Sequence, residues 1–226
     1  ALAYSGIYKL SSAATLTGLV VPATGRRLEI KPYAIADATT GFLGPQPSPT
    51  ALGANGGVDV KFGLTQGLTA DLTYNTDFAQ VEVDEQQVNL TRFGLFFPEK
   101  REFFLEGQGI FDFGPGRISG PTTYYFQGER YGSVTPVLFF SRRIGLNGGQ
   151  TVPIQGGGRI TGKTGPYSLG LLNVQTGAEA TAGAVPTNFS VVRLKRDILR
   201  RSSIGAMFTG RTVTIAQDGA NRVYGV

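Results

Sequence analysis

Apolar and polar residues alternate along several stretches of the chain. The alternation is clearest at positions 28–31, 58–65 and 68–75, and it places the two kinds of side chain on opposite faces of a strand. Gln66-Gly67 separates the last two stretches, and a two-residue connection containing glycine favours a tight hairpin. We therefore predict antiparallel strands with one apolar and one polar face. The apolar face of the first hairpin strand should carry Val58, Val60, Phe62 and Leu64, and its polar face Asp59, Lys61 and Thr65.

The second half of the chain repeats the pattern less regularly. Its glycine-rich and proline-containing breakers separate candidate strands at 136–142, 154–163, 167–175, 188–198, 203–211 and from 222 onward. Several of these candidates contain about 9 to 11 residues, the length of a tilted strand that crosses a membrane, whereas strands of soluble sheets usually contain about 5 to 6. The spacing predicts an antiparallel meander, and the lengths favour a membrane β-barrel.

The stretch at 191–198 fits a barrel wall. Val192, Leu194 and Ile198 can face lipid, while the residues between them, Arg193, Lys195 and Asp197, face inward. Arg196 then falls on the lipid side, which is acceptable only at the membrane rim because arginine at the midplane costs about 2 to 4 kcal/mol. A soluble β-sandwich or lectin-like sheet carries the same alternation and stays an alternative at this point.

Positions 77–118 break the period of two and concentrate charge and aromatic rings. Seven acidic and three basic residues lie between Asp77 and Glu106, in a chain whose net charge is +5. From Gly107 onward thirteen basic residues accompany five acidic ones. We expect 77–118 to be an acidic and aromatic insert, or plug, folded inside strands formed by 1–76 and 119–226, because buried charges are normally paired. The predicted lumen ion-pair network comprises Glu99, Lys100, Arg101, Glu102, Glu106, Arg142, Arg143, Arg159 and Arg193, with Phe96, Phe97, Phe103 and Phe104 buried around it.

Composition excludes several functional classes. The chain contains 33 Gly but no Cys and no His, which excludes disulfides, Cys or His metal sites and imidazole-based catalysis. Its apolar runs are only a few residues long, whereas a spanning helix needs about 20, so no transmembrane helix is predicted. The N-terminal residues lack the basic and apolar regions of a signal peptide, and we expect any such peptide to lie upstream or to have been removed.

Other readings of the charged residues remain alternatives. Asp77, Glu82, Asp84 and Glu85 supply oxygen ligands suited to Ca²⁺, but their spacing does not match an EF-hand. Glu99, Glu102 and Glu106 include carboxylates of the kind that a glycosidase uses in pairs, although glutamates beside Lys100 and Arg101 are more typical of an ion-paired loop. The basic residues are spread over many strands without a nucleic-acid-binding module, so lipopolysaccharide phosphates, lumen carboxylates or an anionic solute are the favoured counter-charges.

Longer motifs also resemble a known family. The runs at 75–84, 88–93, 96–101 and 103–107 are similar to a signature of uncharacterised bacterial outer-membrane proteins, and 140–145 and 170–175 are similar to later parts of the same family. In that family a periplasmic domain similar to the family 9 carbohydrate-binding modules precedes a C-terminal β-barrel. The chain lacks that module and ends Gly225-Val226 without a closing aromatic, so it resembles the first part of such a barrel. The resemblance implies a bacterial outer-membrane location and does not extend to sugar binding.

The expected protein is thus all-β: an antiparallel meander forming part of an outer-membrane β-barrel with an inward-folded insert. Its expected role is that of a structural envelope component or a solute-uptake conduit, with membrane lipid, lipopolysaccharide and a glycan or other solute as partners. We favour a role without catalysis. The alternative is a carbohydrate-active enzyme or glycan-binding β protein, which the absence of Trp weakens because Trp is the usual sugar-stacking side chain.

Overall fold

A computed structural model gives the fold of most of the chain. The residues it describes are 18, 27–40, 51–76, 99–113, 125–126, 129–130, 137–147, 150–199, 202–214 and 219–226. Of the insert, 77–118, the structure describes 99–113.

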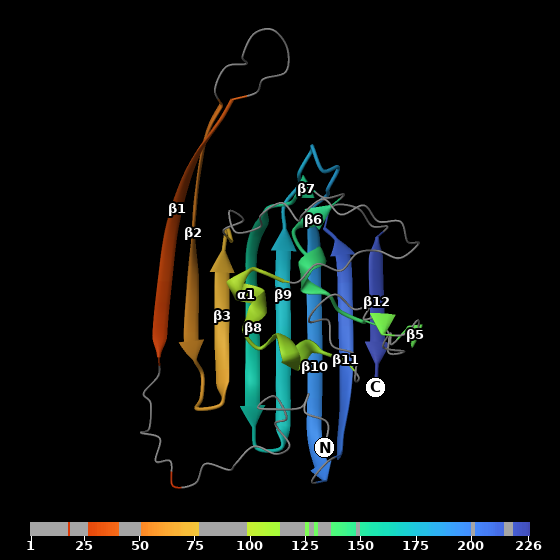
Figure 1. The fold of residues 1–226 in the computed structure, drawn as a ribbon. Helices are drawn as coiled ribbons and strands as arrows, with labels where there is room; N and C mark the ends of the chain where they lie inside the picture. The colour runs from red at the N-terminus through yellow and green to blue at the C-terminus, as the bar shows by residue number, and fades with distance from the viewer. Residues whose placement is uncertain are drawn as a thin grey trace.

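Eight antiparallel strands form one open sheet (Figure 1). The strands pair in the order β1-β2-β3-β8-β9-β10-β11-β12, so the chain folds as a meander with one long excursion between β3 and β8. Their bounds are Leu28–Thr39 (β1), Ala51–Gly63 (β2), Leu68–Tyr74 (β3), Ile154–Thr164 (β8), Tyr167–Thr176 (β9), Thr187–Leu199 (β10), Ser202–Val213 (β11) and Ala220–Gly225 (β12). The predicted all-β antiparallel fold is confirmed, and the described strands do not close into a barrel.

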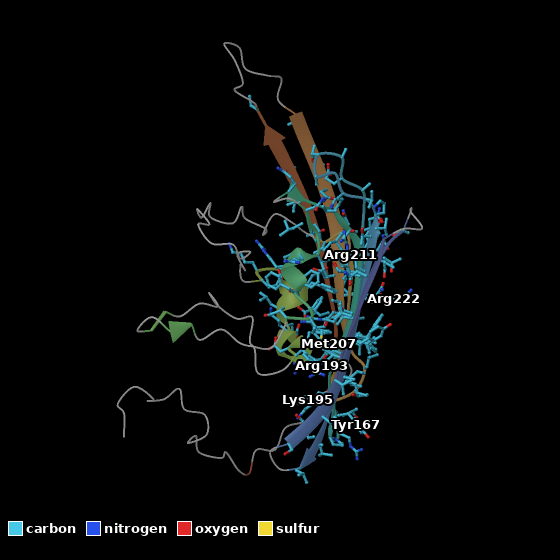
Figure 2. All side chains as sticks on the ribbon, turned by 90° about the vertical axis from the view of Figure 1, so that its right-hand side faces the viewer. Tyr167, Arg193, Lys195, Met207, Arg211 and Arg222 are labelled. Carbon is cyan, nitrogen blue, oxygen red and sulfur yellow. The ribbon has the colours of Figure 1, made fainter. Side chains whose placement is uncertain are left out.

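The excursion between β3 and β8 carries the short elements. They are α1 (Glu102–Leu105), η3 (Gln108–Phe111), η4 (Ser141–Arg143) and the two-residue strands β4 (Tyr125–Phe126), β5 (Glu129–Arg130), β6 (Leu146–Asn147) and β7 (Gln150–Thr151). The helical turns lie on one face of the sheet, as Figures 1 and 2 show from two directions. We call this the inner face and the opposite one the outer face. Within the described residues, no helix is long and apolar enough to span a membrane.

Two local predictions were wrong. The stretch at 136–142 is not a strand: its described residues run without regular structure into the 3₁₀ turn η4, where Ser141 and Arg142 are buried. The connection between β2 and β3 spans four residues, 64–67, in which the backbone N–H groups of Leu64 and Thr65 donate to the carbonyl of Leu68. A short apolar run cannot by itself distinguish a strand from another buried segment, which explains the first error.

On β3 and β10, charged or polar side chains are buried on the covered face of the sheet, and apolar side chains are exposed on the open face. A sheet of a soluble protein usually has the opposite arrangement. On β3, Asp71 is 5% exposed and Thr73 is buried, whereas Leu72 is 57% exposed and Tyr74 is also exposed. On β10, Arg193 is buried between the exposed Val192 and Leu194. At these positions of β3 and β10, polar side chains therefore face inward and apolar side chains face outward.

Strand register shows how far each kind of side chain extends across the sheet. One row on the inner face consists of Glu29, Lys61, Asp71, Arg159, Leu172, Val191, Thr209 and Val223. The neighbouring row on the outer face consists of Leu28, Phe62, Ala70, Ile160, Leu171, Val192, Phe208 and Tyr224. The inner row changes from charged to uncharged residues between β8 and β9, and the outer row is apolar throughout.

The apolar core lies between the inner face and the segments that cover it. Its buried residues are Phe103, Phe104, Phe111, Ile144, Ile154, Leu172, Val174, Val191 and Met207. Glycines allow the close approach: a Cβ at Gly170 would lie 2.9 Å from side-chain atoms of Ile110 and Phe111, and one at Gly225 would lie 2.6 Å from Phe113. The high glycine content thus partly reflects the tight fit of aromatic rings against the wall.

Candidate functional site

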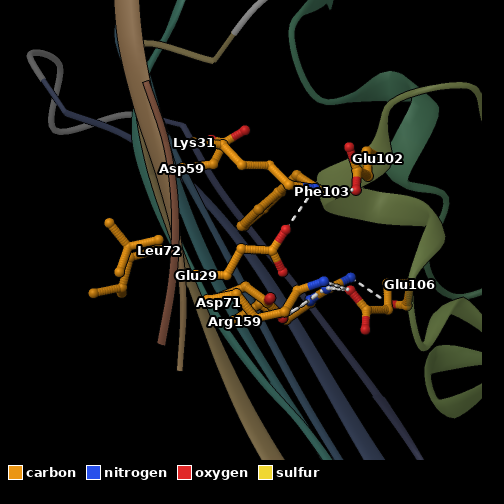
Figure 3. Close-up of a pocket in the computed structure, with 11 residues that line it drawn as sticks. Glu29, Lys31, Asp59, Asp71, Leu72, Glu102, Phe103, Glu106 and Arg159 are labelled. Carbon is orange, nitrogen blue, oxygen red and sulfur yellow. Dashed lines mark hydrogen bonds and ion pairs between the residues drawn. The ribbon is translucent and has the colours of Figure 1, made fainter. Parts of the chain in front are cut away.

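The charged half of the inner row meets α1 and the turn that follows it. Glu29, Lys61, Asp71 and Arg159 stand side by side on β1, β2, β3 and β8, and α1 lies over them (Figure 3). Figure 3 also shows Leu72 pointing away from this group, through the outer face. We call this arrangement the charged seam. Lys31, Asp59, Glu102, Phe103 and Glu106 complete it.

Arg159 is the centre of the charged seam. Its side chain is 2% exposed, and its Nη2 and Nε donate to Oδ2 of Asp71 at 2.7 and 3.2 Å. Nη2 also lies 3.8 Å from a carboxylate oxygen of Glu106, and Nη1 donates to the backbone carbonyl of Glu106. The guanidinium stands 5.3 Å from the centre of the Phe103 ring. One wall arginine therefore holds both a neighbouring strand and the insert.

Two lysines of the wall add exposed contacts to the insert. Lys61 forms an ion pair with Glu106. Nζ of Lys31 donates to Oε1 of Glu102 at 2.8 Å and lies 3.3 Å from Glu29. The hydrogen bond from Lys31, with its positive charge, lowers the pKa of Glu102. These exposed pairs fix the position of α1 but add little to the stability of the fold, because surface ion pairs contribute little to the free energy of folding.

A second, buried network ties the insert to η4. Arg101 binds the Glu99 carboxylate in a bidentate manner, with Nε–Oε1 and Nη2–Oε2 distances of 2.8 Å. Its remaining donors reach the carbonyls of Ile144 at 2.5 Å and Ser141 at 2.8 Å, and the Ser141 hydroxyl donates to Glu99 at 2.7 Å. The guanidinium also stacks 4.2 Å from the centre of the Phe104 ring. Every strong acceptor and donor of the pair is satisfied, as a buried ion pair requires.

The environment of Glu99 sets its protonation. Burial is the largest single influence and on its own would raise the pKa, but the hydrogen bonds and charge of Arg101, with the hydroxyl of Ser141, lower the pKa below the ordinary glutamate value. A glycosidase acid needs the opposite, a carboxyl whose pKa is raised so that it carries a proton. The carboxylates at 99 and 102 are therefore suited to fixing the insert rather than to donating protons.

The remaining residues of the predicted network occupy different places. Lys100 is exposed, and its backbone N–H donates to Glu99. Arg142 and Arg143 both belong to η4, where Arg142 is buried and Arg143 is exposed. Arg193 is buried on β10 with its guanidinium 5.3 Å from the Phe113 ring centre. The structure thus gathers Glu102, Glu106 and Arg159 in the charged seam, joins Glu99 to Arg101, and leaves Arg143 and Arg193 apart.

The predicted calcium ligands cannot be placed. Asp77, Glu82, Asp84 and Glu85 lie outside the described residues, as do Phe96 and Phe97 of the predicted aromatic cluster. Among the residues that are described, no group of three or more acidic side chains is arranged to hold a metal ion.

Sequence reasoning missed five wall residues of the charged seam. Glu29, Lys31, Lys61 and Asp71 lie in alternating strands but were not assigned to the ion-pair network. The signal was present, because each is a charged residue in an alternating strand, but the partner of each depends on the register between strands. Asp59 is the fifth case: it accepts a hydrogen bond from the Thr73 hydroxyl at 2.5 Å.

Similarity to known proteins is limited to the first half of the chain. Residues 24–115 match the family model of a domain of unknown function, DUF5916. This range includes β1 to β3 and the insert through Phe113, and it therefore contains most of the charged seam but not Arg159. The chain matches no curated protein and no solved structure.

Proposed function

We propose that the chain forms part of the wall of a bacterial outer-membrane β-barrel, with its insert folded into the lumen, and that it serves as an envelope component or a solute-uptake conduit. The observation that carries the proposal is the reversal of the two faces. The outer row from Leu28 to Tyr224 is apolar on all eight strands, while Asp71, Arg159 and Arg193 are buried on the inner face. A soluble protein rarely exposes so continuous an apolar surface, whereas a barrel in lipid requires one.

Strand length supports the same role. Six of the eight strands contain ten to thirteen residues. A tilted strand needs about 9 to 11 residues to cross the hydrocarbon layer, so these strands are long enough to span it.

The outer apolar surface also runs diagonally. On β3 it includes Leu72 and Tyr74, but the residues in register with them on β10 are the polar Ser190 and Asn188. On β10 the apolar surface lies lower, at Val192 and Leu194. The band therefore shifts along the strands by about one residue per strand. With a rise of about 3.3 Å per residue and a strand spacing of about 4.8 Å, this shift corresponds to a tilt of about 35°, within the range of membrane barrels.

Arg196 fits the lower edge of this band. It faces outward and forms the last pair of the β9–β10 ladder, opposite Tyr167. Its guanidinium lies 5.4 Å from the centre of the Tyr167 ring. An arginine stacked on a tyrosine suits the boundary between lipid and water, where both residues are favourable.

Arginine substitutions within one outer row test the proposal. Leu72 and Asn173 lie in the same row, but the diagonal band places Leu72 in lipid and Asn173 outside it. Leu72→Arg should prevent assembly into the outer-membrane fraction of a Gram-negative host, and Asn173→Arg should assemble like the parent protein. The readouts are membrane fractionation, detergent extraction and resistance to added protease. Recovery of the parent chain as a folded, detergent-free soluble protein, with both variants equally tolerated, would rule the membrane role out.

A further inference from the structure

A second hollow on the inner face lies far from the charged seam. It has a volume of about 600 Å³, within the range of about 300 to 1,000 Å³ that is typical of small-molecule sites. Strands β10 to β12 form its floor, and the turn after η4 and the turn at 183–185 form its rim. We call it the arginine cavity, after Arg143 on the rim and Arg211 on the floor.

The polar groups of the arginine cavity include two guanidinium groups, from Arg143 and Arg211. The amides of Asn147 and Asn221 also line it, and the Asn147 amide already donates to the carbonyl of Ala182 at 2.8 Å. The remaining polar lining residues are Thr176, Thr187 and Thr209. Neither arginine forms an ion pair within the part of the chain that the structure describes, in contrast to Arg101 and Arg159. Guanidinium groups bind carboxylate and phosphate oxygens through paired hydrogen bonds, and these two are available for such an anion.

No carboxylate lines the arginine cavity among the described residues. Glu179 belongs to the neighbouring turn, but its Oε1 accepts hydrogen bonds from the backbone N–H and the hydroxyl of Thr181, at 3.2 and 2.8 Å. That carboxylate is held within its own turn. The positive charge of the cavity is therefore not neutralised by this turn.

Further cations lie along the same wall. Arg193 is buried on the inner face, and its Nε has no hydrogen-bond partner in the described part of the chain. Lys195 follows two residues later on β10 and is exposed. Figure 2 shows Lys195, Arg193 and Arg211 at successive heights along the sheet. These cations share the inner face of the sheet with the arginine cavity, and positive charge on one wall raises the local concentration of anions.

Apolar side chains form another part of the lining. They belong to Leu138, Val152, Phe189 and Val223. A site that combines two guanidinium groups with apolar walls suits an anion with an apolar body better than a bare inorganic ion, because both parts of the ligand then find complementary surface.

We propose that the arginine cavity binds a small organic anion, with a carboxylate held by Arg143 and Arg211 and an apolar body against Phe189 and Val223. The assignment rests on the proposed function only in placing the cavity in a barrel lumen, where it serves as a binding station for an anionic solute. Binding itself is a property of the folded chain and can be measured in detergent solution.

Calorimetric titration of the purified protein with benzoate tests the assignment, with benzamide as the neutral match and inorganic phosphate as the bare anion. Arg211→Gln and Arg143→Gln should each weaken benzoate binding about tenfold or more, since each removes a charge-assisted contact. Arg222→Gln is the matched control, because Arg222 is exposed on the outer face of the same hairpin. Benzamide should not bind, and phosphate should bind more weakly than benzoate.

The outcomes separate the site from the membrane role. Absence of saturable benzoate binding to the folded parent protein, or equal losses in all three variants, would overturn the anion site. If phosphate bound more tightly than benzoate, the proposed contact between the apolar body of the ligand and the apolar wall would be wrong. If the chain fractionates as a soluble protein and still binds benzoate specifically, the anion site is supported. Its placement in a barrel lumen would then be wrong. The circular dichroism spectrum of each variant establishes that it has folded before it is titrated.

Discussion

Asp71 and Arg159 pair directly across the β3–β8 ladder, with a carboxylate oxygen 2.7 Å from Nη2 and both side chains buried. The two strands are neighbours in the sheet although the whole excursion that carries the insert separates them in sequence. The pair therefore closes the wall at the point where the chain leaves it and returns. Because Arg159 also contacts Glu106, the same guanidinium joins the wall to the insert.

Removing the charge of Asp71 should destabilise the protein strongly. Asp71→Asn leaves the buried Arg159 guanidinium with only the more distant and exposed carboxylate of Glu106, and breaking a buried ion pair typically costs about 3 kcal/mol or more. We expect a clear fall in the urea midpoint of the detergent-solubilised protein. Asp197→Asn is the control, since Asp197 on β10 pairs with Lys163 on β8 at 3.0 Å, but on the surface and with β9 between the two strands. That variant should unfold almost like the parent protein, and equal midpoints for both variants would contradict a buried role for Asp71.

The Glu99–Arg101 pair should make stability depend on acid pH. The pKa of Glu99 is lowered in the folded state, so its contribution is fully present above the unfolded value of about 4.3 and is lost as pH falls through the folded pKa. Unfolding midpoints measured between pH 6 and 3 should fall steadily below that value. Glu99→Gln should start from a lower midpoint at pH 6 and decline less on acidification. If the variant and the parent lost stability in parallel, the acid sensitivity would have to arise elsewhere.

The glycine at 170 should not tolerate even one methyl group. Its Cβ would lie 2.9 Å from Ile110 and Phe111, and such overpacking typically costs about 1 to 3 kcal/mol. Gly170→Ala should therefore lower the urea midpoint. Gly63→Ala serves as the control, because the nearest atom to its Cβ would be 3.7 Å away. Adding Ile110→Ala to Gly170→Ala should recover part of the loss, and strictly additive effects would show that the two residues do not contact each other.

How far the sequence predicts this structure depends on the distance over which each feature acts. Alternation is local, so it identified the strands around Val60 and Val192 and the faces of their neighbours correctly. Register between strands is not local, because it is fixed by pairing across the insert. The partnership of Asp71 with Arg159 could therefore not be read from either strand alone. The bidentate contact between Glu99 and Arg101 has a different origin, since it depends on the turn η4 where the sequence suggested a strand.

The insert provides the most direct test of whether the proposed barrel conducts. Its described part covers the inner face through α1, η3 and the core residues Phe103, Phe104 and Phe111. Deleting 84–109 removes five acidic and three basic residues and leaves Lys31 and Lys61 without Glu102 and Glu106. The lumen should become both wider and more positive.

We therefore expect the deletion variant to conduct more current in planar bilayers and to favour anions over cations more strongly, as read from the reversal potential in a salt gradient. Asp197→Asn again provides the comparison, because it removes one exposed acidic group without opening the lumen. Arg159 keeps Asp71 as its partner in the deletion variant, so the wall itself should survive. If the insert only braced the wall, the deletion would lower the unfolding midpoint and leave the conductance unchanged. That result would assign the chain a structural role in the envelope rather than a transport role.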